Sequence, residues 1–538
     1  MSAPAERVPT THSDPDERLQ RSRRIDWRFV LPDPSPGRVG YLGPPDPELL
    51  DALVDAGWET TVLDEATPWE PGLAPGLDLV VVVRPMARSL AHATRAVRDG
   101  GALYVECRGV IGRSLRDRSL LPSVAARRLE RAGFGGIRRH CPVPGSNPRM
   151  IVPIDAPQAL GLLMARRRGL FGRWPVRAGI EVLRRTGLLQ LLAPTVALVA
   201  ARSPNAAPDA VSSHLDRTGA RLPDAATSGP LLLTPRFRAS RNVVALVPNR
   251  PGREAVVAVK LSRQGQGGET TKREADVLRT LEQAGGARTA PRVLDVGAPW
   301  GLPTLVETAV PGTPLDPGAV RRDPETAAEL GLGWLVTLAR PGGDPRPAAE
   351  RLDRLLFRPL DAFESAVPLT DDEARIVEDT RGIGDTLRDA RLPSVTEHGD
   401  ASHPNLIRTP DGGLTAVDWE LGVADGIAGH DLFSFLAYLA IARAHAATPA
   451  EQGAAIVDAV VRPADWAGRA MLEYAGRIGL DPALLRPLGV VAWCRLTIGL
   501  VERLHDGTLT ATAPETAAWL RDHRFWTAWR TSAADLRS

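Results

Sequence analysis

Short apolar runs alternate with amphipathic stretches along the first part of the chain. The runs at 38–42 and 78–83 have the length and composition of buried strands, and the stretches at 46–56 and 124–134 repeat apolar residues at helical spacing. Strands that alternate with helices favour a parallel sheet with flanking helices. We therefore expect an α/β, Rossmann-like domain over residues 26–205.

The pattern changes at residues 206–228, which are rich in Pro, Ala and Ser and which we interpret as a linker. Three strand-like runs follow, then a helix and two further strand-like runs, before the chain becomes mostly helical. This order predicts an α+β domain with a small β-rich lobe at 229–318 and a large helical lobe at 319–535. Residues 1–25 are polar and charged, and we expect them to form a disordered tail.

Composition narrows the class of protein without identifying it. Of 538 residues, 43% are hydrophobic and 24% are charged, and the net charge of +2 gives no reason to expect a nucleic-acid partner. The cysteines, Cys107, Cys141 and Cys494, lie far apart, which excludes a disulfide framework and suits a reducing compartment. The most apolar run, 188–201, contains Pro194 and is shorter than the roughly 20 residues that span a bilayer. No apolar signal segment is evident, so we expect a cytoplasmic protein without a membrane span.

Lysine is rare in this chain, and Lys260 ends the apolar run 255–261. The only other lysine is Lys272, although Lys and Arg together number 66. An ammonium is a compact charge with rotatable donors, which suits phosphate oxygens where the flat arginine fork would not fit. Glu274 lies in the helix predicted to follow, where its carboxylate could hold such a lysine. Taken alone, a lysine in this position is more typical of a solvent-exposed strand end.

A second pattern of polar residues occurs in the segment VTEHGDASHPNLIRTPDGGLTAVDWELG, residues 395–422. Asp400 is followed by Asn405 in a D-x4-N spacing, and Asp418 comes after a Pro-Asp-Gly-Gly turn that allows it to face Asn405 across a short hairpin. Phosphoryl transfer requires a carboxylate to orient and deprotonate the attacking hydroxyl, and oxygen ligands to hold Mg²⁺ on the phosphates. Asp400 suits the first role, and Asn405 with Asp418 the second.

The HGD-x4-N motif followed by VDWE resembles the aminoglycoside phosphotransferase and choline kinase-like family, over roughly residues 229–535. The resemblance implies a protein-kinase-like fold and a reaction in which ATP or GTP, with Mg²⁺, phosphorylates a small-molecule hydroxyl on a sugar, an aminoglycoside-like compound or an amino alcohol. It also implies a role for each matching residue: phosphate contact for Lys260, pairing with it for Glu274, nucleobase binding by the hinge backbone for Glu307 to Ala309, catalysis for Asp400, metal binding for Asn405 and Asp418, and bracing of the catalytic loop for Asp431.

The chain departs from that family's pattern in two places. The family often has a histidine two residues after the catalytic aspartate, whereas here His403 comes third, and we expect it to pack in the loop. No G-x-G-x-x-G precedes Lys260; the segment 237–248 takes the place of the loop that covers the phosphates. Trp419 is interpreted as a core residue, and Glu420 is compatible with either a metal-supporting or a surface role.

The N-terminal part resembles a class I S-adenosylmethionine-dependent methyltransferase, from its strand, turn and helix order over 26–64 and its late segments at 130–145 and 195–203. In place of a glycine-rich cofactor turn it has Gly40 and Gly43 followed by Pro44, Pro45 and Pro47. Each proline removes a backbone N–H where the cofactor needs close approach. We therefore expect a degenerate domain used for docking or substrate presentation, without S-adenosylmethionine as a cofactor.

Two alternatives to the kinase interpretation stay open. The chain could be a non-catalytic binding module, a pseudokinase joined to a pseudo-methyltransferase, or a methyltransferase with an accessory kinase-like domain. The acceptor, the choice between ATP and GTP, and the oligomeric state are not indicated by the sequence.

Overall fold

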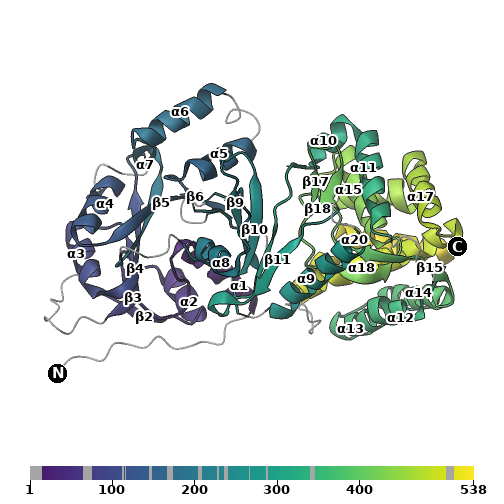
Figure 1. Ribbon diagram of the computed structural model, residues 1–538. Helices are drawn as coiled ribbons and strands as arrows, with labels where there is room; N and C mark the ends of the chain where they lie inside the picture. Colours follow the sequence, from purple (N-terminus) through teal and green to yellow (C-terminus); the bar gives the residue numbers. More distant parts are fainter. Residues whose placement is uncertain are drawn as a thin grey trace. The chain divides into compact units, whose positions relative to one another are not determined.

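The computed structural model (Figure 1) forms two compact units, each of which is described by itself. Unit 1 comprises Met1–Thr271 with Leu294–Ala309, and unit 2 comprises Lys272–Val293 with Val310–Ser538. The residues that the structure describes are 15–64, 76–111, 114, 117–144, 148–166, 174–203, 209–226, 229–235, 240–265, 267–285, 289–339, 346–504 and 514–537.

Unit 1 contains the parallel strands that the sequence predicts. β1 pairs in parallel with both β2 and β3, and β3 pairs in parallel with β4. β1 and β3 are buried along most of their length, as their unbroken apolar runs predict, because both faces of this part of the sheet are covered by helices. The strands are β1 (Arg38–Leu42), β2 (Glu59–Val62), β3 (Leu77–Val83) and β4 (Val97–Arg108).

The sheet does not stay parallel, and in this the prediction of a parallel sheet is wrong. β7 (Thr195–Ala201) lies antiparallel between β4 and β5 (Gly135–Val143), and β5 is antiparallel to β6 (Met150–Pro153). The connection from β5 to β6 is too short for a crossover, so only antiparallel pairing is possible. An alternating strand and helix pattern does not specify strand direction.

The same sheet continues into the region that the sequence predicts as a separate β-rich lobe. β6 pairs antiparallel with β8 (Leu231–Leu233), and β9 (Asn242–Pro248), β10 (Ala255–Ser262), β12 (Thr304–Thr308) and β11 (Val293–Gly297) follow. The result is one 12-stranded sheet within unit 1. The strands around Lys260 are therefore hydrogen-bonded, strand by strand, to those of the N-terminal region.

Two layers of helices cover the two faces of this sheet. One core contains apolar residues of η1, α2 and α8 with Val257, Val259 and Leu261 of β10. The other contains residues of α3, α4 and α5 with Ala258 of the same strand. The helices of unit 1 outside the N-terminal segment are α2 (Pro47–Asp55), α3 (Ala87–Ala96), α4 (Pro122–Arg131), α5 (Pro157–Arg166), α6 (Trp174–Arg185), α7 (Leu189–Leu192), α8 (Ala210–Thr218) and η3 (Pro299–Gly301). α8 lies in the segment expected to be a linker, and most of its first half is buried.

The expectation of a disordered tail fails for residues 15–25. They belong to α1 (Pro15–Ser22) and to η1 (Arg23–Val30), whose residues are almost all buried. Trp27 stacks on Tyr104 of β4 with ring centroids 4.0 Å apart. Charged residues made this segment look solvated, but Asp26 and Arg28 are buried in polar contacts. Residues 1–14 lie outside the described part of the chain.

Unit 2 is mostly helical, as expected for the large lobe. Its small sheets are β13 (Thr313–Pro314) with β17 (Leu406–Arg408) and β18 (Leu414–Ala416), β14 (Arg346–Pro347) with β15 (Arg391–Leu392), and β16 (Ser394–Glu397) with β19 (Val423–Ile427). Its helices are α10 (Pro317–Arg322), α11 (Pro324–Thr337), α12 (Ala349–Leu352), η4 (Asp353–Phe357), α13 (Arg358–Ala366), α14 (Asp371–Leu387), α15 (His430–Arg443), α16 (Pro449–Ile456), η5 (Val457–Val461), α17 (Asp465–Ile478), η6 (Pro482–Leu484), α18 (Leu485–Leu504), α19 (Pro514–Arg521) and α20 (Arg524–Arg537). α9 (Gly268–Gln283) begins in unit 1 and lies mainly in unit 2.

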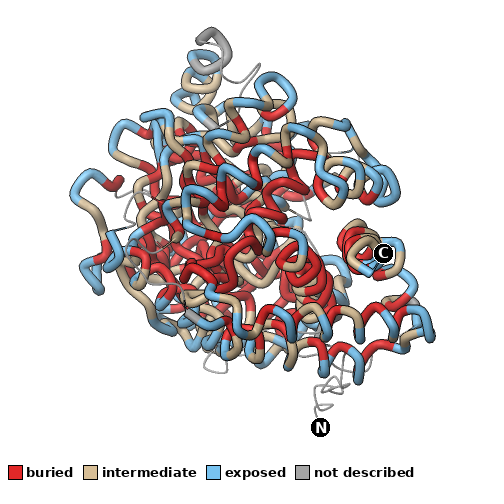
Figure 2. Tube along the Cα trace, turned by 90° about the vertical axis from the view of Figure 1, so that its right-hand side faces the viewer, coloured by how far each residue is buried: buried red, intermediate tan, exposed pale blue. Residues whose placement is uncertain are grey.

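The interior of unit 2 is organised around α15 and α18. Nearly every residue of α15 is buried, and the tube in Figure 2 shows such buried runs in red. Within the described residues, Pro482–Arg503 is the one helical stretch long and apolar enough to cross a membrane, and 67% of its most apolar window is buried inside the protein. That degree of burial is typical of the core helix of a globular unit.

Candidate functional site

The backbone just before Asp400 is held by the buried carboxylate of Asp431. Both side-chain oxygens of Asp431, at the start of α15, accept backbone N–H groups, from His398 at 2.6 Å and from Gly399 at 2.9 Å. Gly399 has φ +85°, a conformation that favours glycine, and a side chain here would meet the backbone of Leu421. The expected brace by Asp431 is therefore confirmed as geometry.

Asp400 itself lies at the open end of this loop. Ser402 donates its hydroxyl to Oδ1 of Asp400 at 2.8 Å, and Nδ2 of Asn405 donates to Oδ2 at 3.2 Å. A guanidinium nitrogen of Arg503, in α18, lies 4.0 Å from Oδ2. The carboxylate is oriented on both oxygens, yet its side chain is 39% exposed. It can therefore meet a group that arrives from solvent.

The hairpin that the sequence predicts brings Asn405 and Asp418 to its two ends. Leu406 of β17 pairs with Ala416 of β18, and the N–H of Val417 donates to the carbonyl of Asn405 at 2.9 Å. Asp418 follows with φ +70°, in the left-handed region that few residues other than glycine adopt. Such a strained backbone is common where a side chain must be presented for function.

The residue after Asp418 fixes that strained turn in place. The N–H of Trp419 donates at 2.9 Å to Oε1 of Glu274, whose side chain is buried in α9. The indole N–H of Trp419 donates to the carbonyl of Ala416, and the residue is fully buried, which confirms the interpretation of Trp419 as a core residue. Glu274 thus holds the backbone next to Asp418, a contact that the sequence did not reveal.

A network of buried charges lies directly beneath the loop. Arg495 of α18 binds Glu397 of β16 through two hydrogen bonds, at 2.8 and 2.6 Å. Burial alone would raise the pKa of Glu397, but the charge of Arg495 lowers it to about 2. Burial and the nearby charge of Glu397 raise the pKa of Asp431 to about 7, against its two backbone hydrogen bonds. Burial lowers the pKa of His430 to about 3.

The donor set at the hairpin fits a divalent cation that is also bound by phosphate oxygens. Asn405 uses its amide nitrogen on Asp400, at the carboxylate and at the backbone carbonyl, which leaves its oxygen as the ligand atom. With a carboxylate of Asp418 this makes two hard oxygen ligands, as Mg²⁺ prefers. The described residues hold no cluster of three or more His, Cys, Asp or Glu side chains suited to a metal. A cation here would therefore take further ligands from substrate or water.

Three of the sequence-predicted residues lie in unit 1. Lys260 of β10 is buried and stands opposite Val244 of β9 and Leu305 of β12. Glu307 is buried in β12 opposite Ala258, and the N–H of Ala309 donates to the carbonyl of Val256 at 3.0 Å. The pairing of Lys260 with Glu274 stays a prediction. The segment 237–248 is described only from Ser240 onward.

The structure thus brings Asp400 and Asn405 into contact and seats Asp418 beside Glu274. Sequence reasoning missed Ser402, Arg503 and the pair of Glu397 with Arg495. Ser402 could have been found from its place two residues after Asp400, where a hydroxyl reaches back to the carboxylate. The two arginines could not, because α18 is distant in sequence and the chain is rich in arginine.

Comparisons with known proteins find one family model and several solved structures that resemble the chain. Residues 238–472 match the phosphotransferase enzyme family, APH. No curated protein matches the chain. Among solved structures, the choline kinase LicA from Streptococcus pneumoniae is 13% identical, with 60% of this chain and 99% of that chain covered and a TM-score of 0.38. The amicoumacin kinase hAmiN, in complex with AMP-PNP, Ca²⁺ and Ami, is 16% identical, with 60% and 93% covered and a TM-score of 0.38.

A third similar structure is the streptomycin–ATP–APH(2")-IIa ternary complex, 13% identical, with 59% of this chain and 97% of that chain covered and a TM-score of 0.35. These structures are distant from the chain in sequence, and the part of the chain that resembles the phosphotransferase enzyme family is residues 238–472.

Proposed function

We propose that the protein transfers the γ-phosphoryl group of a nucleotide, in the presence of Mg²⁺, to a hydroxyl of a small molecule. The observation that carries the proposal is the doubly oriented carboxylate of Asp400, held by Ser402 and Asn405 on a loop braced by Asp431. A carboxylate fixed in this way, yet open to solvent, suits the base of a hydroxyl-directed transfer.

Asp400 orients the acceptor hydroxyl and takes its proton as the hydroxyl oxygen attacks the γ-phosphorus and the bond to the bridging oxygen of the leaving nucleoside diphosphate breaks. Asn405 and Asp418 would hold the cation, which would neutralise charge on the phosphates.

Lys260 is proposed to contact the nucleotide phosphates, and Glu274 to support it. Glu307 to Ala309 is the proposed hinge for the nucleobase. Because the amide of Ala309 already donates within the sheet, a base at the hinge would meet its carbonyl oxygen or a neighbouring amide. Acceptor identity and the choice between ATP and GTP are left to experiment.

The N-terminal part of unit 1 is proposed to be a degenerate methyltransferase-type domain. What supports this is the strand order β2-β1-β3-β4-β7-β5, with the antiparallel β7 between β4 and β5. Its strands are joined to the strand of Lys260 through the pairing of β6 with β8. This favours a structural, supporting role for the domain over a separate enzymatic activity.

The first experiment is a thermal-shift titration with ATP and with GTP, each with and without Mg²⁺, on the wild type and on Asp418→Asn. At 100 times the dissociation constant, nucleotide should stabilise the protein by about 2.7 kcal/mol. We expect the wild type to shift most with Mg²⁺ and the variant to lose the Mg²⁺ dependence while it still binds nucleotide. If no nucleotide shifts the wild type, the protein is not a nucleotide-dependent phosphotransferase.

A further inference from the structure

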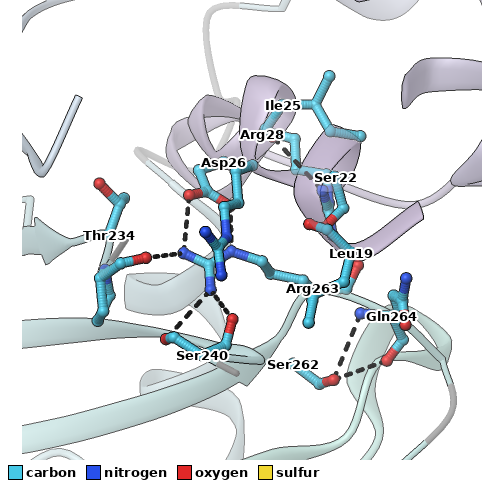
Figure 3. Close-up of polar contacts among 12 residues, drawn as sticks. Leu19, Ser22, Ile25, Asp26, Arg28, Thr234, Ser240, Ser262, Arg263 and Gln264 are labelled. Atoms are coloured by element: carbon cyan, nitrogen blue, oxygen red, sulfur yellow. Dashed lines mark hydrogen bonds and ion pairs between the residues drawn. The ribbon is translucent and has the colours of Figure 1, made fainter. Parts of the chain in front are cut away.

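The end of the Lys260 strand is tied to the N-terminal segment, residues 18–31, by one buried arginine. Arg263 directly follows β10 and stands three residues after Lys260. Its Nε and Nη2 bind the two carboxylate oxygens of Asp26 at 2.8 and 3.0 Å, across 237 residues of sequence. The side chains of Arg263 and Asp26 are 0% and 1% exposed. Figure 3 shows the two groups facing each other, with the helical turn of Asp26 above the strands.

The same guanidinium also holds the ends of two neighbouring strands. Nη2 donates to the carbonyl of Pro235, just after β8, at 3.1 Å, and Nη1 donates to the carbonyl of Ser240, just before β9, at 2.7 Å. The backbone N–H of Arg263 donates to the carbonyl of Arg241. One side chain therefore fixes the ends of β8, β9 and β10 relative to each other. Only a flat fork with five donors can satisfy this set of acceptors at once.

A second arginine of the segment reinforces this arrangement. Nη2 of Arg28 donates to the backbone carbonyl of Arg263, and Asp26 accepts a hydrogen bond from the Arg263 side chain. The N-terminal segment therefore contacts both the side chain and the backbone of Arg263. Burial and the nearby Arg263, opposed by Asp26, lower the pKa of Arg28 to about 10. The carboxylate of Asp26 thus binds Arg263 directly, and its charge also acts on the nearby guanidinium of Arg28.

The N-terminal segment is packed into the core of unit 1 along its length. Trp27 stacks on Tyr104, and Phe29 and Ile25 are fully buried in the core of unit 1. The N–H of Ala210 in α8 donates to the carbonyl of Leu31 at 2.9 Å. Alternate residues of η1 therefore face the core and the end of β10. A shift of the segment would move Arg263 with it.

We propose that Asp26 and Arg263 are positioning residues for nucleotide binding: through them the N-terminal segment sets where the strand of Lys260 ends. This rests on the proposed function, in which Lys260 contacts the nucleotide phosphates. The consequence is that a part of the chain outside residues 238–472, the phosphotransferase match, takes part in substrate affinity.

The test compares Asp26→Asn with Trp27→Phe, a matched control in the same segment. Asparagine keeps the shape of Asp26 and removes the charge that holds Arg263, whereas Trp27→Phe weakens the stacking on Tyr104 and leaves the ion pair intact. Both should lower the melting temperature. We expect only Asp26→Asn to raise the dissociation constant and KM of the nucleotide, by about tenfold, because misplaced binding groups lose affinity steeply. The KM of the acceptor should not change.

Arg263→Lys keeps the positive charge and provides a second test in case Asp26→Asn does not fold. A single ammonium cannot satisfy Asp26 and both carbonyls, so we expect a smaller fall in melting temperature with the same rise in nucleotide KM. If both Asp26→Asn and Arg263→Lys keep nucleotide KM within twofold of wild type, the pair is only structural and the proposal is wrong while the phosphotransferase function stands. If the wild type itself binds no nucleotide, both fail together.

Discussion

Breaking the buried pair of Glu397 with Arg495 should loosen the catalytic loop. Arg495→Met would leave Glu397, whose side chain is 1% exposed, without its bidentate partner. Burial raises the pKa of Glu397, yet with Arg495 beside it the pKa is about 2 instead of the ordinary 4.5, a net preference for the ionised form of about 3 kcal/mol at 1.36 kcal/mol per pKa unit. Removal of one partner of a buried pair typically costs about 3–5 kcal/mol, so both routes give the same magnitude.

Hydrogen exchange of the native protein is the suitable assay, because a protein of two compact units need not unfold in one step. Peptides covering β16 and β19 should lose about 3 kcal/mol of protection in Arg495→Met at pH 7. Arg462→Met is the matched control: Arg462 makes a bidentate pair with Asp535, but its side chain is 61% exposed, so the loss there should stay below about 1 kcal/mol.

The same reasoning gives the sign of a pH effect. The pKa of Glu397 is lowered in the folded protein, so its contribution to stability is fully present above about pH 4.5 and is lost as the pH falls towards about 2. Glu397→Gln should remove that pH dependence. The reasoning is refuted if Arg495→Met and Arg462→Met cost the same, or if Glu397→Gln leaves the acid transition of β16 unchanged.

Three further predictions concern the loop itself. Asp400→Asn should lower kcat by about 10²–10⁴-fold with nucleotide binding retained, measured by coupled nucleoside diphosphate release; an unchanged kcat would exclude Asp400 as the base. Ser402→Ala removes the hydroxyl bonded to Asp400 and should lower kcat about tenfold, whereas Ser365→Ala, on the exposed face of α13, should have no effect. The pKa of Asp431 is raised to about 7 by burial, so protonation below that pH should weaken its hydrogen bonds to His398 and Gly399 and lower kcat. Asp431→Asn should abolish this fall of kcat at acidic pH. If the fall persists in the variant, another group causes it.

Local patterns were sufficient to predict the parts of the fold that local chemistry decides. The apolar run at β10 and the Pro-Asp-Gly-Gly turn between β17 and β18 gave the strand of Lys260 and the hairpin that separates Asn405 from Asp418. The order of these residues then led to the phosphotransferase family. Each of these signals depends on neighbours within a few positions, which is the range over which sequence periodicity is informative.

The features of the fold and of the site that the sequence did not predict depend on contacts between residues that are distant in sequence. Residues 15–25 read as solvated because they are charged, yet Asp26 next to them and Arg263 neutralise each other in the core. The pairing of β6 with β8, which joins the N-terminal strands to those of Lys260, involves two short strands with no distinguishing pattern. No periodicity reports a contact of this kind, since either strand could pair at several edges.

The positions of the buried arginines give a physical reason why lysine is rare in this chain. Arg263 stands three residues after Lys260, and Glu397, the partner of Arg495, stands three residues before Asp400. In both units a buried bidentate pair therefore lies close in sequence to the residue that is proposed to do the chemistry. A flat fork can lock two oxygens and spare donors for nearby carbonyls, as Arg263 does with Pro235 and Ser240, which a lysine cannot. A phosphate contact requires the opposite property, a compact charged group that can adjust its position. At position 260 the chain has a lysine instead of an arginine.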